Sequence, residues 1–193
     1  MKIHDVSQKS EEWHALRKQY FLTASNALAI ATGGDGLETL IWQSFEETKE
    51  FTNGDMERGV ELEPQARILY EMGTENTVKE VAFVTDEDIC PIAGASPDGL
   101  VNGDGLIEIK CPSNKTYYYL LNGKEIDKKY LYQMQMQLLF TGRKWNDFVA
   151  FNPNFKQSLI IKRVFPDTEI QQKIIAGLNK GEGIYKEIKT KIT

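Results

Sequence analysis

The residues best suited to chemistry lie in two short segments near the middle of the chain, SPDGL at 96–100 and GLIEIKCP at 105–112. Side chains alternate along a strand, so Glu108 and Lys110 share one face while the isoleucines next to them point to the other. The Asn-Gly and Asp-Gly pairs between the two segments predict a hairpin, because these residues tolerate positive φ. The hairpin would bring Asp98 back beside Glu108.

Two carboxylates with an ammonium group beside them suit the metal-assisted hydrolysis of a phosphodiester. Mg²⁺ prefers hard oxygen ligands and keeps several waters, so Asp98, Glu108 and the backbone carbonyl of Ile109 would suffice to hold it. A bound metal lowers the pKa of a water and stabilises charge that develops on the phosphate. Lys110 could orient or deprotonate the attacking water, or stabilise the transition state.

Two simpler interpretations compete with this one. A Glu-x-Lys pair on a strand is often a solvated face, and Asp98 could be only the turn residue of Pro-Asp-Gly. The apolar residues around Glu108 favour a metal site, because a buried strand tolerates charges only when they are paired or bound to metal. A calcium loop at 102–105 is excluded, since Leu100 and Cys111 would occupy positions that require acidic residues.

The elements that would hold these residues begin with a helical N-terminal third. We expect four helices there: one capped by Ser10, one from about Thr23 to Gly33-Gly34, one from Leu37 to about Glu50, and a fourth. The fourth helix follows a turn and cap at Asn53-Gly54-Asp55 and ends at Gly73. Pro64 should kink or break it near Glu63.

The rest of the chain alternates strands and helices. We expect strands at 78–84, 91–95, 99–101 and 106–110, a helix from near Ser113, a helix from Asp127 to Phe140 stopped by Gly142, strands at 147–151 and 158–165, and a final helix after Pro166-Asp167. This order predicts one mixed α/β domain over residues 1–193, with helices around a central mixed sheet.

Composition sets the broad class. A chain of 193 residues that is 41% hydrophobic and 26% charged is ordinary for a folded soluble protein. It has no apolar run long enough to span a bilayer and no signal-peptide core. Cys90 and Cys111 have neither metal-ligand spacing nor disulfide density, which predicts a reduced, cytoplasmic protein without a membrane partner. The net charge of −5 argues mildly against binding driven mainly by phosphates, although lysines could gather at 110–115 and 124–129.

The central motif resembles that of the phage lambda exonuclease and YqaJ family of viral recombination nucleases, which has the restriction-endonuclease-like fold. Three further segments fit the same family: WHALR at 13–17 with TAS at 23–25, the stretch from Gly59 through Glu63 to Arg67, and YLYQMQ at 130–135. The resemblance covers roughly residues 13 to 165.

The resemblance implies a role for particular residues. Asp98, Glu108 and the Ile109 carbonyl would hold Mg²⁺ or Mn²⁺, and Glu63 would support the metal directly or through water. Lys110 would be the catalytic lysine, and Gln133 would orient the water or Lys110. Arg17, Ser25 and Ser96 would bind a 5′-phosphate. The spacing between the segments 13–17 and 23–25 is one residue longer than in the lambda enzyme, so Lys18 is an alternative to Arg17. Glu38 is the nearest match to an active-site histidine of that enzyme.

Without the resemblance, Glu63 could be a helix-surface acid. Gln133 could be a polar spacer that shares a face with Gln137 while Gln135 points away.

The activity implied is that of a metal-dependent 5′→3′ exodeoxyribonuclease, which degrades one strand of double-stranded DNA from its ends for phage-type recombination by single-strand annealing in a bacterial cell. A ring-shaped homotrimer and a single-strand-annealing protein as partner are implied as well. Two alternatives stay open: an endonuclease with the same core, and a non-catalytic DNA-binding module that kept the fold.

Overall fold

The computed structural model describes residues 1–8, 10–46 and 54–192, and its N-terminal third is helical as predicted. The helices there are α1 (Glu11–Gln19), α2 (Ala27–Thr32), preceded by the short 3-10 turn η1 (Ala24–Asn26), α3 (Gly34–Gln43) and α4 (Gly54–Thr74). Ser10 caps α1, since its side chain accepts a hydrogen bond from the backbone N–H of Trp13. The helix expected from Leu37 to about Glu50 begins earlier, at Gly34, and ends earlier, at Gln43. Asn53, where a turn is expected, lies outside the described residues.

Three other features of this region also differ from the sequence prediction. The helix expected from Thr23 begins only at Ala27, because Leu22–Thr23 forms a short strand, β2, which pairs with a later strand. The break predicted at Pro64 is wrong: α4 continues through it, and Val60, whose carbonyl loses its helical partner there, lies on the exposed side of the helix. Gly73 does not end α4 either, since Glu75 takes the positive φ, 57°, that follows the last turn.

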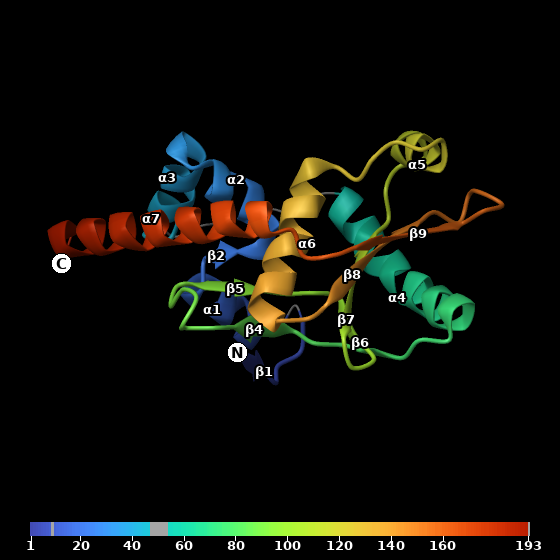
Figure 1. Cartoon of the computed structure of the whole chain (residues 1–193), viewed down its shortest axis with the longest axis horizontal. Helices are drawn as coiled ribbons and strands as arrows, with labels where there is room; N and C mark the ends of the chain where they lie inside the picture. Colours follow the sequence, from blue (N-terminus) through green and yellow to red (C-terminus); the bar gives the residue numbers. More distant parts are fainter. Residues whose placement is uncertain (9, 47–53, 193) are drawn as a thin grey trace.

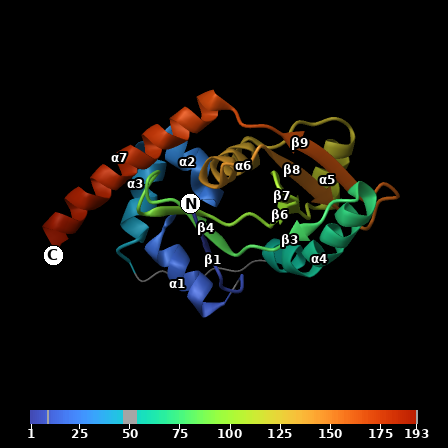
Figure 2. The ribbon, with the colours of Figure 1, turned by 60° about the horizontal axis from the view of Figure 1, so that its bottom comes forward.

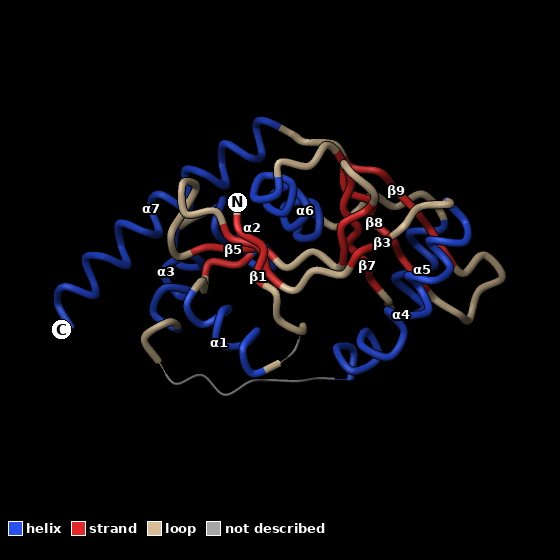
Figure 3. Tube along the Cα trace, turned by 90° about the horizontal axis from the view of Figure 1, so that it is seen from below, coloured by secondary structure: helices blue, strands red, loops and turns tan. Residues whose placement is uncertain are grey.

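The strands form two mixed sheets. The five-stranded sheet has the order β3 (Val78–Lys79), β6 (Gly99–Val101), β7 (Gly105–Lys110), β8 (Trp145–Phe151), β9 (Leu159–Val164). The four-stranded sheet has the order β1 (Lys2–His4), β4 (Phe83–Thr85), β5 (Ala93–Ala95), β2. The single strand predicted at 78–84 is thus divided, because β3 pairs with β6 in one sheet whereas β4 pairs with β1 and β5 in the other. The chain crosses between the sheets again at 96–98, where the Ser-Pro-Asp segment lies (Figure 3).

Three further helices complete the fold, and all were predicted. α5 (Asn114–Leu121) is capped by Ser113, α6 (Lys128–Thr141) runs from its cap Asp127 to Gly142, and α7 (Thr168–Ile192) follows Asp167. α6 packs against strands of both sheets, whereas α7 lies along α2, α3 and α6 with its C-terminal end projecting from the molecule (Figure 1). None of the helices in the described ranges is both long and apolar enough to cross a bilayer.

The five-stranded sheet separates two layers of helices (Figure 2). Ile107 and Ile109 pack on the α4 side, in a cluster that contains Tyr70. The opposite face of the sheet packs against α5 and α6, where Phe148 and Met134 belong to one buried hydrophobic cluster. Because β7 and β8 are parallel with Glu108 beside Phe148, the Glu108 side chain belongs to this second face. The predicted alternation along the central strand is therefore confirmed.

Candidate active site

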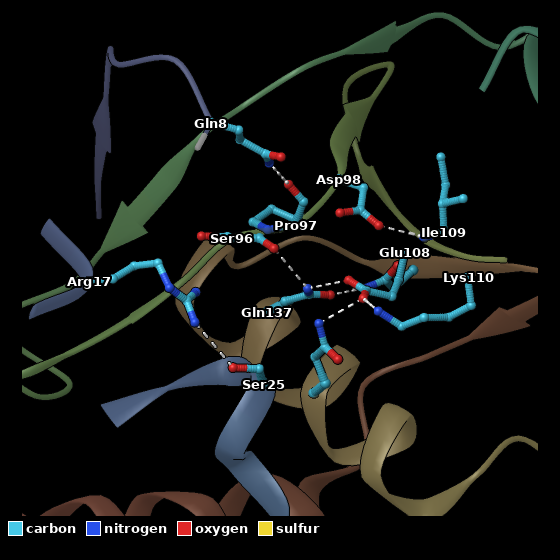
Figure 4. Close-up of polar contacts among 12 residues, drawn as sticks. Gln8, Arg17, Ser25, Ser96, Pro97, Asp98, Glu108, Ile109, Lys110 and Gln137 are labelled. Carbon is cyan, nitrogen blue, oxygen red and sulfur yellow. Dashed lines mark hydrogen bonds and ion pairs between the residues drawn. The ribbon is translucent and has the colours of Figure 1, made fainter. Parts of the chain in front are cut away.

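The hairpin of β6 and β7 brings the two predicted carboxylates together. The backbone N–H of Asp98 donates to the Ile107 carbonyl over 3.2 Å, which continues the ladder one residue before β6. The N–H of Ile109 donates to Asp98 Oδ2 over 2.6 Å. Asp98 therefore lies next to Glu108 across the hairpin, as the turn residues predicted (Figure 4).

The Glu108 carboxylate is almost fully buried, at 1% exposure, and is surrounded by donors. Its Oε1 accepts a hydrogen bond from Lys110 Nζ and another from Gln133 Nε2, the latter at 2.7 Å. Its Oε2 accepts from Gln137 Nε2 at 2.5 Å. A carboxylate can be buried only when its charge is compensated in this way. The structure thus brings Lys110 and Gln133 together at the same oxygen of this carboxylate.

Charges in the site perturb one another strongly. Burial and the neighbouring Glu108 raise the pKa of Asp98 well above its ordinary range, and Glu63 adds to the effect. Burial lowers the pKa of Lys110, but Glu108 and Asp98 raise it by more, so its pKa lies above the ordinary value and the ammonium form is favoured. A carboxyl group whose ionisation is opposed by burial and by a neighbouring carboxylate, with a cation at one side, is typical of a functional site.

The donor set fits a hard divalent cation. Asp98 and Glu108 supply carboxylate oxygens, and a cation between them would relieve the repulsion that raises the Asp98 pKa. Within the described ranges no three His, Cys, Asp or Glu side chains gather closely enough to hold a metal by themselves. A bound ion would therefore need backbone carbonyl and water ligands as well, which suits Mg²⁺ better than a metal that requires a complete side-chain cage.

Glu63 lies on α4 beside this site. Its Oε1 accepts from Arg67 Nη2 at 2.8 Å, and the same nitrogen lies 3.4 Å from the Asp98 carbonyl oxygen. Arg67 also pairs with Glu80 through Nη1 at 2.5 Å. The sequence predicts no role for Arg67, which belongs to the segment 59–67 that resembles the family. The spacing of four residues between Glu63 and Arg67 on one helix was the signal that could have identified it as a neighbour of the site.

The residues expected at a 5′-phosphate come from α1, η1 and the 96–98 segment. Arg17 Nη2 lies 3.5 Å from Ser25 Oγ, and its guanidinium lies 4.6 Å from the centre of the Trp13 ring. The Ser96 hydroxyl is buried and forms no hydrogen bond with the described part of the chain. In the view of Figure 4, Ser96 lies between the Arg17–Ser25 pair and the carboxylates. Lys18 lines, with Arg17, a cavity of about 520 Å³.

Two further expectations concern α6 and α3. Gln135 points away from the site as predicted: its amide donates to the Phe165 carbonyl and accepts from the N–H of Asp167, both at 2.8 Å, at the start of α7. The sequence places Gln137 on the same helix face as Gln133 but predicts no role for it; the spacing of four residues is the signal that identifies it as a neighbour of the site. Glu38 is exposed on α3, which packs on α2 and α7, away from the hairpin (Figure 1).

A hairpin that carries Asp98, Glu108 and Lys110 on a mixed sheet between helices defines an α/β protein with the restriction-endonuclease-like core. The chain belongs to the family with a YqaJ-like viral recombinase domain, whose model matches residues 12–144.

Solved structures agree with this assignment. The crystal structure of LHK-Exo, an alkaline exonuclease from Laribacter hongkongensis, shares 35% identity with a TM-score of 0.81 and covers 94% of this chain and 97% of that chain. LHK-Exo in complex with dAMP matches equally. A phage-related exonuclease from Haemophilus somnus, at 15% identity, has the same fold with a TM-score of 0.67 over 89% of this chain and 96% of that chain. No curated protein gives a significant match.

Proposed function

We propose that this chain is a metal-dependent exodeoxyribonuclease that degrades one strand of double-stranded DNA from its 5′ end. The observation that carries the proposal is the adjacent pair of Asp98 and the buried Glu108, with Lys110 beside it, held on a hairpin. Its relative LHK-Exo is an alkaline exonuclease and has been crystallised with dAMP. A deoxynucleoside monophosphate of that kind is the product expected when an exonuclease removes one nucleotide at a time.

The roles of the central residues follow from their contacts. Asp98, Glu108 and the Ile109 carbonyl would hold Mg²⁺, or Mn²⁺ in its place, with Glu63 as a support through water. When bound, the metal would lower the pKa of a water and stabilise charge that develops on the phosphate. Lys110 donates from its ammonium group to orient the attacking water and to stabilise charge that develops on the scissile phosphate.

Gln133 acts beside Lys110. Its amide donates to the Oε1 of Glu108 that Lys110 also contacts, so Gln133 holds the carboxylate oxygen that directs the ammonium group of Lys110.

The direction of degradation would be set by a phosphate anchor. The Arg17 guanidinium can hold a phosphate with two parallel hydrogen bonds, and the hydroxyls of Ser25 and Ser96 can add neutral donors. The buried Ser96 hydroxyl without a partner among the described residues supports this, since such a group is expected to find one in the complex. An anchored 5′-phosphate would place the first phosphodiester bond at the carboxylates.

The biological setting that we propose is phage-type recombination by single-strand annealing. A ring-shaped homotrimer would retain a duplex by enclosing it, and a single-strand-annealing protein would receive the exposed strand. Enclosure would offset the weak electrostatic affinity expected of a chain with net charge −5.

The test is digestion of a 5′-phosphorylated linear duplex, labelled separately at each end, with Mg²⁺ and with EDTA. We expect Mg²⁺-dependent release of 5′-terminal mononucleotides and no cleavage of a covalently closed circle. Nicking of the circle would instead indicate an endonuclease with the same core. Binding of the duplex without any cleavage would indicate a non-catalytic module.

A further inference from the structure

Gln137 holds the Glu108 carboxylate, but the family resemblance gives it no role. It lies one turn after Gln133 on α6, and its side chain is fully buried. Gln137 Nε2 donates to Glu108 Oε2 at 2.5 Å and lies 3.4 Å from the carbonyl oxygen of Ser96. Both neighbours are acceptors, so only the NH₂ end of the amide can face the active site (Figure 4).

The other end of the Gln137 amide is held by Asn146 on β8. Asn146 Nδ2 donates to Gln137 Oε1 at 2.8 Å, and neither side chain is exposed. This contact reinforces the direction that the two acceptors impose on the Gln137 amide. If Gln137 were rotated, its oxygen would face the Glu108 carboxylate, and its NH₂ group would face the NH₂ group of Asn146.

The fold alone does not explain an asparagine at position 146. The Asn146 Oδ1 is buried and accepts no hydrogen bond within the described part of the chain. Its register partner on β7 is Leu106, an apolar residue of the core. A buried amide oxygen without a partner is destabilising, so an apolar side chain would suit the packing better. What Asn146 provides is a donor for Gln137.

The hydrogen bonds on the Glu108 carboxylate indicate the role of the Asn146 donor. Each carboxylate oxygen can accept about two hydrogen bonds. Among the residues that the structure describes, Oε1 accepts two, from Lys110 and Gln133, whereas Oε2 accepts one, from Gln137. The acceptor position that remains is therefore on Oε2, the oxygen that Gln137 holds. A cation bound without displacing these donors would take that position.

We propose that Asn146 and Gln137 form a directional pair of buried amides that orients Oε2 of Glu108 for a divalent metal ion. Both are positioning residues, and their effect is on metal affinity. The inference rests on the proposed function, since it takes Glu108 as a metal ligand. Outer-shell residues of this kind typically change metal affinity about 10- to 100-fold.

The first test is Mn²⁺ titration of the full chain by calorimetry, together with the Mg²⁺ dependence of duplex cleavage. Gln137→Met keeps the length of the side chain but removes the amide, and we expect Mn²⁺ binding about 10-fold weaker. The matched control is Gln135→Met on the same helix, whose amide holds the start of α7. That control should lower the melting temperature and leave Mn²⁺ affinity unchanged. Equal affinities in wild type and Gln137→Met would overturn the proposal.

The second test addresses direction through Asn146. Asn146→Leu removes the donor and the unpartnered Asn146 oxygen but leaves Gln137 Oε1 without its donor, so one unpartnered oxygen replaces another. We therefore expect weaker Mn²⁺ binding with little change in thermal stability. Asn146→Asp, which replaces the donor by an acceptor, should weaken binding similarly and serves if the leucine variant does not fold. Because Asn146 acts through Gln137, the double variant with Gln137→Met should bind no more weakly than Gln137→Met alone.

The outcomes separate the two proposals. Additive losses in the double variant would overturn the directional pair. A wild-type chain that binds no Mn²⁺ and cuts no DNA would overturn the proposed function and this inference together. Wild-type binding with unaffected variants would overturn the inference alone.

Discussion

The backbone N–H of Ile109 donates a hydrogen bond to Asp98 Oδ2 over 2.6 Å, so that β7 holds the carboxylate of the segment that precedes β6. This bond uses one oxygen of Asp98 and fixes its side chain beside Glu108 without any metal. An asparagine at position 98 could keep the same bond through its amide oxygen. The hydrogen bond and the charge of Asp98 can therefore be separated by substitution.

Asp98→Asn should abolish cleavage while leaving the fold intact. The variant keeps an acceptor for the Ile109 N–H but loses a metal-ligand charge, so we expect activity to fall by more than about 100-fold and Mn²⁺ binding to weaken. In EDTA its melting temperature should be equal to or above that of the wild type, because burial and repulsion by Glu108, which raise the Asp98 pKa, no longer act on a charged group at this position. Activity near the wild-type level would show that Asp98 is not a metal ligand.

Lys110→Met should separate catalysis from metal binding. The methionine can fill the position of the lysine stem but has no cation, so we expect cleavage at saturating Mg²⁺ to fall by about 100-fold or more. Mn²⁺ affinity should be retained, since both carboxylates remain. Removing the cation beside the buried Glu108 should lower stability in EDTA by about 1–3 kcal/mol, and Mg²⁺ should restore much of it. Near-normal turnover would refute the role of this lysine.

The central site could be read from the sequence because its geometry is local. Alternation along β7 and the turn residues at 102–105 are enough to bring Asp98 to Glu108, and both features are confirmed. Asn146 could not be found in this way. It reaches the site through the parallel pairing of β7 and β8, and parallel strands are joined by a long crossover that no short sequence pattern specifies.

The same reason explains the division into two sheets. β-branched residues at 78–84 predict an extended segment, but which strand each part pairs with depends on residues far away in the chain. β3 and β4 have different partners, so one extended segment serves both sheets. The continuity of α4 through Pro64 is also a tertiary effect: the helix is held against β7 and β8 by Ala66 and Tyr70, whose packing outweighs one lost hydrogen bond.

The 5′-phosphate anchor can be assigned to one of two neighbouring cations. We expect 5′-phosphorylated ends to be digested faster than 5′-hydroxyl ends, and Arg17→Ala to reduce this difference strongly. Lys18→Ala is the matched control, because Lys18 lines the adjoining cavity without the contact that Arg17 makes with Ser25. The reverse result, with the preference lost only in Lys18→Ala, would move the anchor to Lys18. Equal rates on both ends in the wild type would contradict an anchor at either residue.

Tyr70 should give the stability a measurable pH dependence. Its hydroxyl donates to Asp147 Oδ2 at 2.7 Å, and Asp147 is also held by Arg163. Tyr70→Phe should therefore lower the free energy of unfolding by about 1–3 kcal/mol at pH 8. Burial and Asp147 raise the Tyr70 pKa above its ordinary value of 10.0.

The phenol's contribution is therefore complete below pH 10 and falls as the pH rises further. The difference between the two proteins should be about 1.4 kcal/mol smaller at pH 11 than at pH 9 in urea unfolding. A constant difference would show that the Tyr70 pKa is not raised.

The closed ring is the prediction with the largest consequence for how an acidic chain could act on DNA. A monomer of net charge −5 should hold a duplex weakly, because few counterions would be released on binding. A ring around the duplex does not need high affinity, since sideways dissociation is blocked and each cleavage presents the next phosphodiester bond. Identical subunits whose head-to-tail contacts close form such rings.

We therefore expect a solution mass near three times 22.0 kDa at micromolar concentration. DNA molecules loaded before a challenge with excess competitor should continue to be degraded, and raising the salt concentration after loading should slow degradation less than raising it before. Asp98→Asn is the control for assembly, since it should form the same oligomer without cleavage. A monomeric mass together with immediate arrest by competitor would exclude the ring, and the assignment of the active site would be unaffected because all its catalytic groups come from one chain.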